Sequence, residues 1–397
     1  MQRLREISND KINRTPLVFK RFLLNKIEWN DRLIGISGAR GCGKTTLMLQ
    51  YIKTKIPTGN EVLYVSLDDI YFSENKLVYF AEDYHKKGGN YLFLDEVHKY
   101  PNWSQELKNI YDNLPDLKVV FTSSSALDIY RGSHDLSRRA MVYHLPGLSF
   151  REFIELRYKI EFPIFTLNEI LTIDEKTIWG IIEKIKPMKL FPEYLKSGYY
   201  PFFNEAKNNY LERLLLTINL VLESDLPSIY NLNYYSVQKI RKMLAVVSRI
   251  APFKPNVQKL AAQSGISRDS LLKYLFYLEK AQIIKWLGKD TFGINYLNKP
   301  DKLYLNNTNL MYALTSETTN IGTLRETFFL NQLSVNHKIN YPKVGDFLVD
   351  GEYLFEVGGI SKTRKQILDI KNAFIAADNI EYRFENKIPL WLFGFLY

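Results

Sequence analysis

The chain has 397 residues, of which 46% are apolar and 24% charged, a composition that excludes disordered and fibrous proteins and allows two to three domains. Its net charge of +10 permits a polyanionic partner without requiring one. The single cysteine, Cys42, excludes an intrachain disulfide, and no apolar run approaches the roughly 18 residues of a membrane span. The first residues have no apolar signal segment, so we expect a cytoplasmic protein without membrane contact.

Strand and helix patterns alternate through the first 124 residues, after an irregular lead-in with a short helix. We expect strands at 32–37, 61–67, 91–96 and 118–124, with helices at 45–52, 73–87 and 103–113. The run "YLFLDE" is continuous in apolar residues, which is typical of a strand buried on both faces. The alternation predicts a parallel α/β sheet.

The pattern changes after about residue 150. "SFREFIELRY" begins a mostly helical region that lasts to about residue 250. A helix-turn-helix is expected next, with its turn at Gly265 and a cap at Ser267, followed by a wing formed by "IIKWLG" and "TFGINYL". The last part predicts a helix at "TLRETFFLNQL", a hairpin turning at Asp350-Gly351, a polar helix near "TRKQILDIKNAF" and a final strand, "PLWLFGFL".

The stretch "ISGARGCGKTTLML" fits the pattern G-x-x-x-x-G-K-T, with Gly38, Gly43, Lys44 and Thr45 in the fixed places. The glycines let backbone N–H groups approach phosphate oxygens, and the following helix adds the positive end of its dipole. Lys44 supplies charge to the β- and γ-phosphates of ATP, and Thr45 offers a hydroxyl to Mg²⁺. The predicted nucleotide-binding residues are Gly38, Ala39, Arg40, Gly41, Cys42, Gly43, Lys44, Thr45 and Thr46.

Two acidic residues, Asp95 and Glu96, end the third predicted strand. At this distance after a glycine loop, we expect Asp95 to hold the metal with Thr45, and Glu96 to polarise the attacking water. Two solvated acids at a strand end are the alternative. The fourth strand ends in "TSSSA", whose hydroxyl residues sense the γ-phosphate on one interpretation and only begin a loop on the other.

The order GARGCGKTT, YLFLDEVHKYPNW, VVFTSSSALDI, RRAMVYHLPGLSFREF and a late DFLV…FEVGG resembles a group of prokaryotic AAA+-type predicted ATPases. The resemblance covers the chain from about residue 16 onward and is looser after residue 150. It implies that Arg139 is a γ-phosphate-sensing or finger arginine, with a surface ion pair as an equal alternative, and that Ser124 is the sensing residue. Arg138 stands where the family has Gly, and Gly147 where it usually has Pro.

The resemblance implies an α/β fold with a P-loop NTPase parallel sheet, then a helical and winged-helix region, then a small α/β nuclease-like domain of the PD-(D/E)xK type. We place the ATPase domain at 1–155, a helical lid or linker at 156–235, the winged helix-turn-helix at 236–300 and the nuclease-like domain at 301–397. Nucleases of this type use an Asp with a Glu and a Lys spaced E-x-K, and the sequence offers Glu326, Asp346 and Glu356. The lysine position is Gly358, with Lys362 or Lys365 further on, so we favour a retained fold without chemistry.

Positive charge is concentrated between residues 236 and 300, where 12 Lys or Arg stand against 3 acids. Lys273, Lys280, Lys285 and Lys289 lie on or beside the second helix and the wing. Such a surface suits contact with DNA phosphates, although a solvated face on a packing module is the alternative.

The sequence therefore predicts a Mg²⁺-dependent ATPase whose cycle repositions a DNA-facing C-terminal half. A nucleotide-gated scaffold that binds protein partners is the alternative, and an ATP-dependent nuclease is third. Whether Arg139 acts within one chain or across a homo-oligomer stays open.

Overall fold

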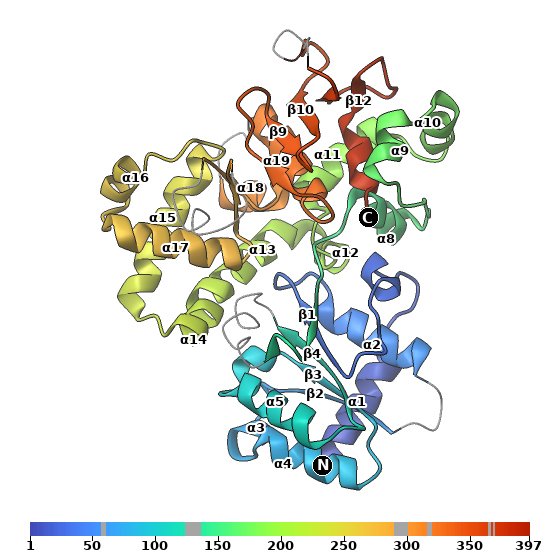
Figure 1. The fold of residues 1–397 in the computed structure, drawn as a ribbon, viewed down its shortest axis with the longest axis vertical. Helices are drawn as coiled ribbons and strands as arrows, with labels where there is room; N and C mark the ends of the chain where they lie inside the picture. The colour runs from blue at the N-terminus through green and yellow to red at the C-terminus, as the bar shows by residue number, and fades with distance from the viewer. Residues whose placement is uncertain (57–60, 124–135, 290–300, 316–319, 364–366, 368–369) are drawn as a thin grey trace. The chain divides into compact units, whose positions relative to one another are not determined.

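A computed structural model describes residues 1–56, 61–123, 136–289, 301–315, 320–363, 367 and 370–397. Its contacts divide the chain into two compact units (Figure 1). Unit 1 comprises Met1–Pro146 and Ser224–Leu232, and unit 2 comprises Gly147–Glu223 and Asn233–Tyr397. The finer division into four domains stays a prediction. In the described part of the chain, no helix combines the length and the apolar character that crossing a membrane requires.

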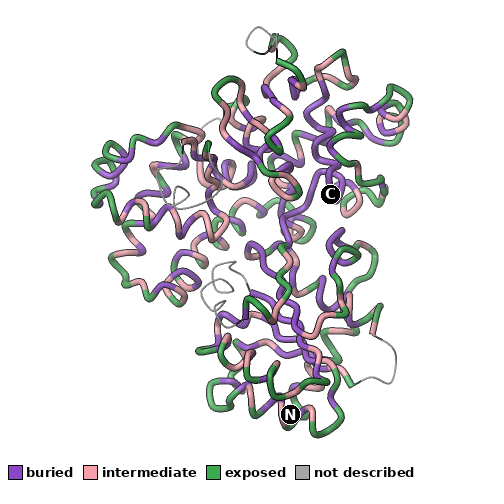
Figure 2. The backbone as a smooth tube through the Cα atoms, viewed as in Figure 1, coloured by how far each residue is buried: buried purple, intermediate pink, exposed green. Residues whose placement is uncertain are grey.

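Unit 1 is built on a parallel sheet with the strand order β2-β3-β4-β1-β5. Its strands are β1 (Leu33–Ser37), β2 (Val62–Ser66), β3 (Tyr91–Asp95), β4 (Lys118–Ser123) and β5 (Met141–His144). The four predicted strands are confirmed, and their central residues are buried (Figure 2). The sequence analysis missed β5, because this edge strand is mostly exposed and has no apolar pattern.

The helices of unit 1 come mainly from the first 113 residues. They are α1 (Gln2–Arg14), η1 (Phe22–Asn25), α2 (Lys44–Lys55), α3 (Tyr71–Glu74), α4 (Leu77–Lys86), η2 (Val97–Lys99), α5 (Trp103–Asn113) and α14 (Leu226–Tyr230). The helix predicted from Ser73 to Lys87 is two helices, because Asn75 is extended and separates α3 from α4. The last helix, α14, arrives from the middle of the chain through the π-helical turn η4 (Val221–Asp225).

Unit 2 begins with the expected helical region. Its helices are α8 (Phe150–Tyr158), α9 (Leu167–Thr172), α10 (Glu175–Ile182), α11 (Pro187–Ser197), α12 (Phe203–Ala206), η3 (Lys207–Asn209), α13 (Tyr210–Leu220), α15 (Tyr234–Ile250), α16 (Val257–Ser264), α17 (Arg268–Lys280), α18 (Thr308–Leu314), α19 (Ile321–Leu333) and η6 (Leu390–Phe395). Ser149 and Glu152 form a capping box at the start of α8, which explains why this helix is readable from sequence.

The two helices predicted around Gly265 are present. Gly265 ends α16 with a backbone in the left-handed region. The Ser267 side chain caps α17 by accepting a hydrogen bond from the N–H of Ser270. After α17, β6 (Ile284–Leu287) pairs antiparallel with β7 (Lys302–Leu305). The second wing strand that the sequence predicts, at 291–297, lies outside the described residues.

A second sheet of five strands, in the order β12-β11-β10-β9-β8, forms the last part of unit 2. Its strands are β8 (Ile339–Asn340), β9 (Phe347–Val349), β10 (Tyr353–Gly358), β11 (Ala373–Ala377) and β12 (Lys387–Pro389). The hairpin turn at Asp350 and Gly351 is confirmed, with φ values of 53° and 73°. Of the helix predicted near 363–374, residues 364–366 and 368–369 lie outside the described residues, and its predicted end is wrong because Ala373 and Phe374 belong to β11.

The predicted final strand is wrong. Residues 390–395 form the 3-10 helix η6, which packs against α8 and α19. Every residue of η6 is buried, so the run is apolar throughout and its periodicity does not distinguish a buried strand from a buried helix.

Candidate nucleotide-binding site

The loop between β1 and α2 has the backbone that its glycines predict. Gly38 has a φ of 153°, and a Cβ atom there would lie 2.3 Å from the carbonyl oxygen of Leu145. Gly43 has a φ of 98° and is the N-cap of α2. Both positions therefore require glycine, and α2 begins directly at the loop. Among the other predicted loop residues, Ala39 and Cys42 are buried while Gly41 and Thr46 are exposed.

The ammonium group of Lys44 is held inside the loop. Its Nζ atom donates to the carbonyl oxygens of Gly38 and Ala39, at 2.9 and 3.0 Å. Arg21 also holds the loop, although the sequence analysis gave this residue no role. Its buried guanidinium donates to the carbonyl oxygen of Cys42 at 2.6 Å. Side-chain donors from Lys44 and Arg21 thus hold three carbonyl groups of the loop.

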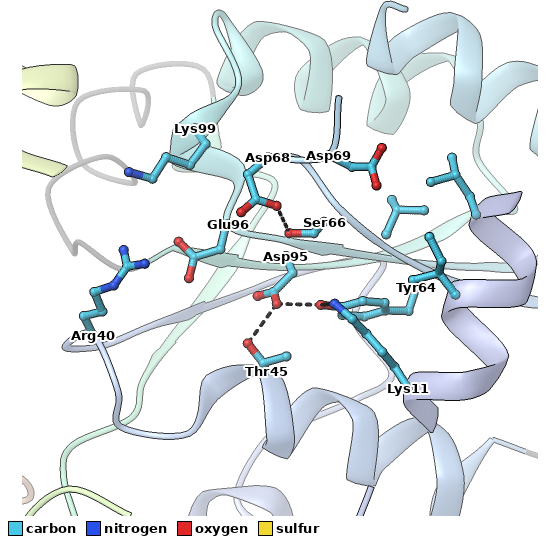
Figure 3. Close-up of a pocket in the computed structure, with 13 residues that line it drawn as sticks. Lys11, Arg40, Thr45, Tyr64, Ser66, Asp68, Asp69, Asp95, Glu96 and Lys99 are labelled. Carbon is cyan, nitrogen blue, oxygen red and sulfur yellow. Dashed lines mark hydrogen bonds between the residues drawn. The ribbon is translucent and has the colours of Figure 1, made fainter. Parts of the chain in front are cut away.

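The structure brings together the two residues predicted to hold the metal. Thr45 Oγ1 donates to Asp95 Oδ2 at 2.8 Å (Figure 3). The Tyr64 hydroxyl donates to the same oxygen at 2.7 Å, and Thr122 Oγ1 donates to Asp95 Oδ1. Asp95 is 4% exposed, so three hydroxyl groups stabilise a buried carboxylate. The sequence analysis missed Tyr64 and Thr122, because each looks like an ordinary strand residue.

Helix α1 adds a cation to this group. Lys11 Nζ lies 3.3 Å from the Tyr64 hydroxyl and 4.8 Å from the centre of the ring. Burial and the neighbouring charge of Asp95 raise the pKa of Tyr64 well above its usual range. Tyr64 therefore stays a neutral phenol that donates its proton to Asp95.

A cavity of about 370 Å³ opens beside these residues. The side chains lining it include Lys11, Arg40, Thr45, Tyr64, Ser66, Asp68, Asp69, Asp95, Glu96 and Lys99 (Figure 3). Mg²⁺ bound with a nucleotide takes oxygen ligands, usually one or two from the protein and the rest from phosphate and water. The hydroxyl of Thr45 and the carboxylate of Asp95 are donors of this kind, so the residues present fit the ion.

Glu96 follows Asp95 at the same cavity. It has a φ of 54°, in the left-handed region, and its N–H donates to Thr122 Oγ1 at 3.1 Å. This backbone turns the chain sharply after β3. One oxygen of the carboxylate, Oε2, lies 3.3 Å from Nε2 of His98, whose side chain is fully buried.

Segment 224–232 places another acid, Asp225, beside two cations that line the cavity, Lys99 and Arg40. Asp225 accepts hydrogen bonds from Lys99 Nζ at 2.7 Å and from Arg40 Nη1 at 3.2 Å. Burial alone would raise the pKa of Asp225, but hydrogen bonds from His98 and Lys99 and the charges of Lys99 and Arg40 outweigh it and hold that pKa well below its usual range. Asp225 is therefore ionised, and it neutralises two cations of the cavity wall.

Of the two residues predicted to sense the γ-phosphate, the structure describes only Arg139. Ser124 lies outside the described residues. Arg139 makes a two-bonded ion pair with Asp112 at the end of α5, with distances of 2.8 and 3.1 Å. Among the residues that the structure describes, Arg139 does not line the cavity. The sensing roles of Arg139 and Ser124 stay predictions.

Of the three acids predicted for a nuclease site in unit 2, Glu326 and Asp346 accept hydrogen bonds from protein groups, whereas the buried Glu356 has an ion pair but no hydrogen bond within the described residues. Lys302 Nζ lies 2.6 Å from Glu326, Lys362 Nζ lies 3.4 Å from Glu356, and Asp346 accepts the N–H of Val357 at 2.9 Å. Burial raises the pKa of Asp346. Lys362 thus reaches the Glu356 carboxylate, while Lys365 lies outside the described residues. Within the described ranges, no three His, Cys, Asp or Glu side chains form a group that could hold a metal.

Two family models match the chain. Residues 30–154 match an AAA domain, and residues 188–321 match a domain of unknown function (DUF8612). The first match covers the parallel sheet and the loop of Lys44, so this region is an AAA-type P-loop domain. No curated protein matches the chain.

Solved structures of AAA+ proteins are distantly similar. AMPPCP-bound DnaA from Aquifex aeolicus is 16% identical with a TM-score of 0.26, covering 70% of this chain and 88% of its own. ADP-bound NtrX from Brucella abortus is 14% identical with a TM-score of 0.30, covering 70% of this chain and 72% of its own. PCH-2 from C. elegans is 13% identical with a TM-score of 0.25, covering 69% and 67%. At such TM-scores the likeness says nothing about function.

Replacing Lys44 should remove tight ATP binding. Hydrogen bonds to charged groups contribute about 1.5 to 3 kcal/mol each, so we expect Lys44→Ala to raise the Kd for ATP–Mg²⁺ by roughly 10- to 150-fold. Lys55→Ala is the matched control, because Lys55 is exposed at the other end of α2. Isothermal titration of both variants checks this, and equal affinities would show that the loop does not bind the phosphates.

The carboxylates of unit 2 should not support DNA cleavage, because Lys302 and Lys362 pair with Glu326 and Glu356, and no metal-binding cluster forms among the residues that the structure describes. We expect plasmid DNA to stay intact when incubated with the protein, ATP and Mg²⁺ or Mn²⁺. Cleavage that disappears in Glu356→Ala would contradict this expectation and identify an active nuclease.

Proposed function

We propose that unit 1 binds ATP with Mg²⁺ and hydrolyses it. The observation that carries the proposal is the hydrogen bond of 2.8 Å between Thr45 and Asp95. It joins the start of the P-loop helix to the acidic end of β3, on a cavity that Glu96 also lines. A glycine loop or an acidic strand end could each arise by chance, but their meeting at one cavity supports a single nucleotide site.

Each residue then has a defined part in the reaction. The N–H groups of the loop and the Lys44 ammonium bind the phosphates, after Lys44 exchanges the carbonyls of Gly38 and Ala39 for phosphate oxygens. Thr45 and Asp95 would hold Mg²⁺, which neutralises charge on the β- and γ-phosphates when bound. Glu96 accepts a proton from the attacking water as the bond to the γ-phosphorus forms and the phosphoanhydride bond breaks.

We also propose that unit 2 contacts DNA through the basic residues of 236–300. Their exposure supports this part of the proposal. The exposed ones are Lys239, Lys242, Arg249, Lys254, Lys259, Arg268, Lys273 and Lys289. Lys285 is a poor phosphate contact, because it lies half-buried on β6 and burial lowers its pKa.

A nucleotide-gated scaffold with slow turnover is the second candidate. The ion pair between Arg139 and Asp112 favours it, because it occupies the guanidinium that the first candidate assigns to the γ-phosphate. ATP turnover measured with and without duplex and single-stranded DNA separates the two candidates. Stimulation by DNA supports the DNA-coupled ATPase, and slow turnover unaffected by DNA supports the scaffold.

Changing the base should separate binding from hydrolysis. Glu96→Gln keeps the shape of the side chain and loses the proton acceptor, so we expect turnover to fall by about 10²- to 10⁴-fold while ATP stays bound. Glu74→Gln, at an exposed position on α3, is the matched control. Asp95→Asn should instead raise the Mg²⁺ concentration needed for half-maximal activity. Unchanged turnover in Glu96→Gln would remove Glu96 from its role.

Contact with DNA should depend on charge and be largely indifferent to sequence, because lysines attract phosphates without reading bases. We expect Lys259→Glu with Lys273→Glu to flatten the slope of log K against log salt by about two units. Lys176→Glu with Lys189→Glu makes the same charge change at exposed positions outside 236–300 and should leave the slope unaltered. If both double variants bound duplex DNA alike, the basic region would be only a solvated face.

A further inference from the structure

A buried histidine, His98, stands between the two acids Glu96 and Asp225. Its Nε2 atom lies 3.3 Å from Glu96 Oε2 and 3.8 Å from Asp225 Oδ1. The side chain of His98 is 0% exposed and that of Asp225 is 3% exposed. One ring nitrogen therefore faces two carboxylates, Glu96 on the cavity wall and Asp225 behind it, and an N–H on that nitrogen is attracted to both.

The Glu96 carboxylate depends on its surroundings for its direction. The oxygen that faces His98, Oε2, is buried and lacks a hydrogen bond of ordinary geometry within the described residues. A buried carboxylate oxygen in this condition is costly unless a donor turns toward it. The imidazole of His98 is the group placed to do this, and the left-handed backbone of Glu96 brings the side chain to it.

Asp225 faces the same nitrogen of the imidazole as Glu96 does. It is held from two directions, by Lys99 from the turn after β3 and by Arg40 from the phosphate loop. The Lys99 ammonium also donates to Ser224 Oγ at 3.0 Å, so the start of segment 224–232 has two bonds to the same lysine. Lys99 and Arg40 thus fix the position of Asp225 independently of His98. The Asp225 carboxylate can therefore hold the His98 ring in one orientation.

We propose that His98 is a positioning residue that orients the Glu96 carboxylate for hydrolysis, and that Asp225 holds the His98 ring in place. This inference rests on the proposed function, in which Glu96 accepts the proton of the attacking water. Segment 224–232 is joined at both of its ends to residues of unit 2. A shift of that segment would move Asp225 and so change the direction of the catalytic carboxylate.

Two substitutions of His98 separate this role from simple packing. His98→Gln keeps an N–H donor near the position of Nε2, whereas His98→Leu fills the space without a donor. We expect His98→Leu to lower kcat by about 10- to 100-fold, the loss typical when a hydrogen-bond partner of a functional side chain is removed. ATP affinity should change by less than about twofold, because the carboxylates that His98 faces, Glu96 and Asp225, are not the groups proposed to bind the phosphates. His98→Gln should keep most of the activity.

Equal activity of the Leu and Gln variants would overturn the inference, because the ring would then only fill space. Melting temperatures measured by circular dichroism show whether His98→Leu folds. If it does not fold, Asp225→Asn carries the test. The expected result is a lower kcat with ATP affinity no weaker than that of the parent, because the same substitution frees Arg40 and Lys99. A parental kcat in Asp225→Asn would overturn the inference.

A double-mutant cycle distinguishes failure of this inference from failure of the proposed function. If His98 acts through Glu96, the double variant Glu96→Gln with His98→Leu should be no slower than Glu96→Gln alone. Losses that multiply would show that His98 acts elsewhere and would overturn the inference. Unchanged turnover in Glu96→Gln itself would overturn the proposed function. If Glu96→Gln does not turn over ATP but His98→Leu is fully active, only the positioning role of His98 is overturned.

Discussion

The buried carboxylate of Asp95 is the point on which the nucleotide site depends. Asp95 is the last residue of β3. It accepts hydrogen bonds from three hydroxyl groups, those of Thr45 on α2, Tyr64 on β2 and Thr122 on β4. Each hydrogen bond to a charged group contributes about 1.5 to 3 kcal/mol, and a buried carboxylate without such donors would be strongly destabilising. Because β2, β3 and β4 are parallel neighbours, the sheet itself brings the side chains of Tyr64, Asp95 and Thr122 together.

This arrangement also sets the place of the proposed base. Thr122 donates to Asp95 and accepts the N–H of Glu96, so one hydroxyl on β4 positions both acids. The left-handed backbone of Glu96 then turns the chain into η2, which carries His98 and Lys99 to Asp225. Asp95, Glu96 and the segment 224–232 are therefore joined by short contacts within unit 1.

What the sequence could predict was local. The glycine loop and the Asp95-Glu96 pair are patterns within a few residues, and the structure brings Thr45 and Asp95, one from each pattern, into contact. Asp225 could not be found in this way, because it lies 126 residues from Lys99 and 185 from Arg40. Tyr64 looks like a core aromatic until its hydroxyl is seen to donate to Asp95. The final helix η6 was mistaken for a strand because complete burial removes the periodic pattern.

The most direct test of the account is a crystal structure of the protein with a non-hydrolysable ATP analogue and Mg²⁺. The account predicts that the Thr45 hydroxyl and the Asp95 carboxylate contact the ion directly or through water, that Lys44 leaves the carbonyls of Gly38 and Ala39 for the phosphates, and that Glu96 faces the γ-phosphate. An analogue bound away from the loop, or an ion held without Thr45 and Asp95, would contradict it.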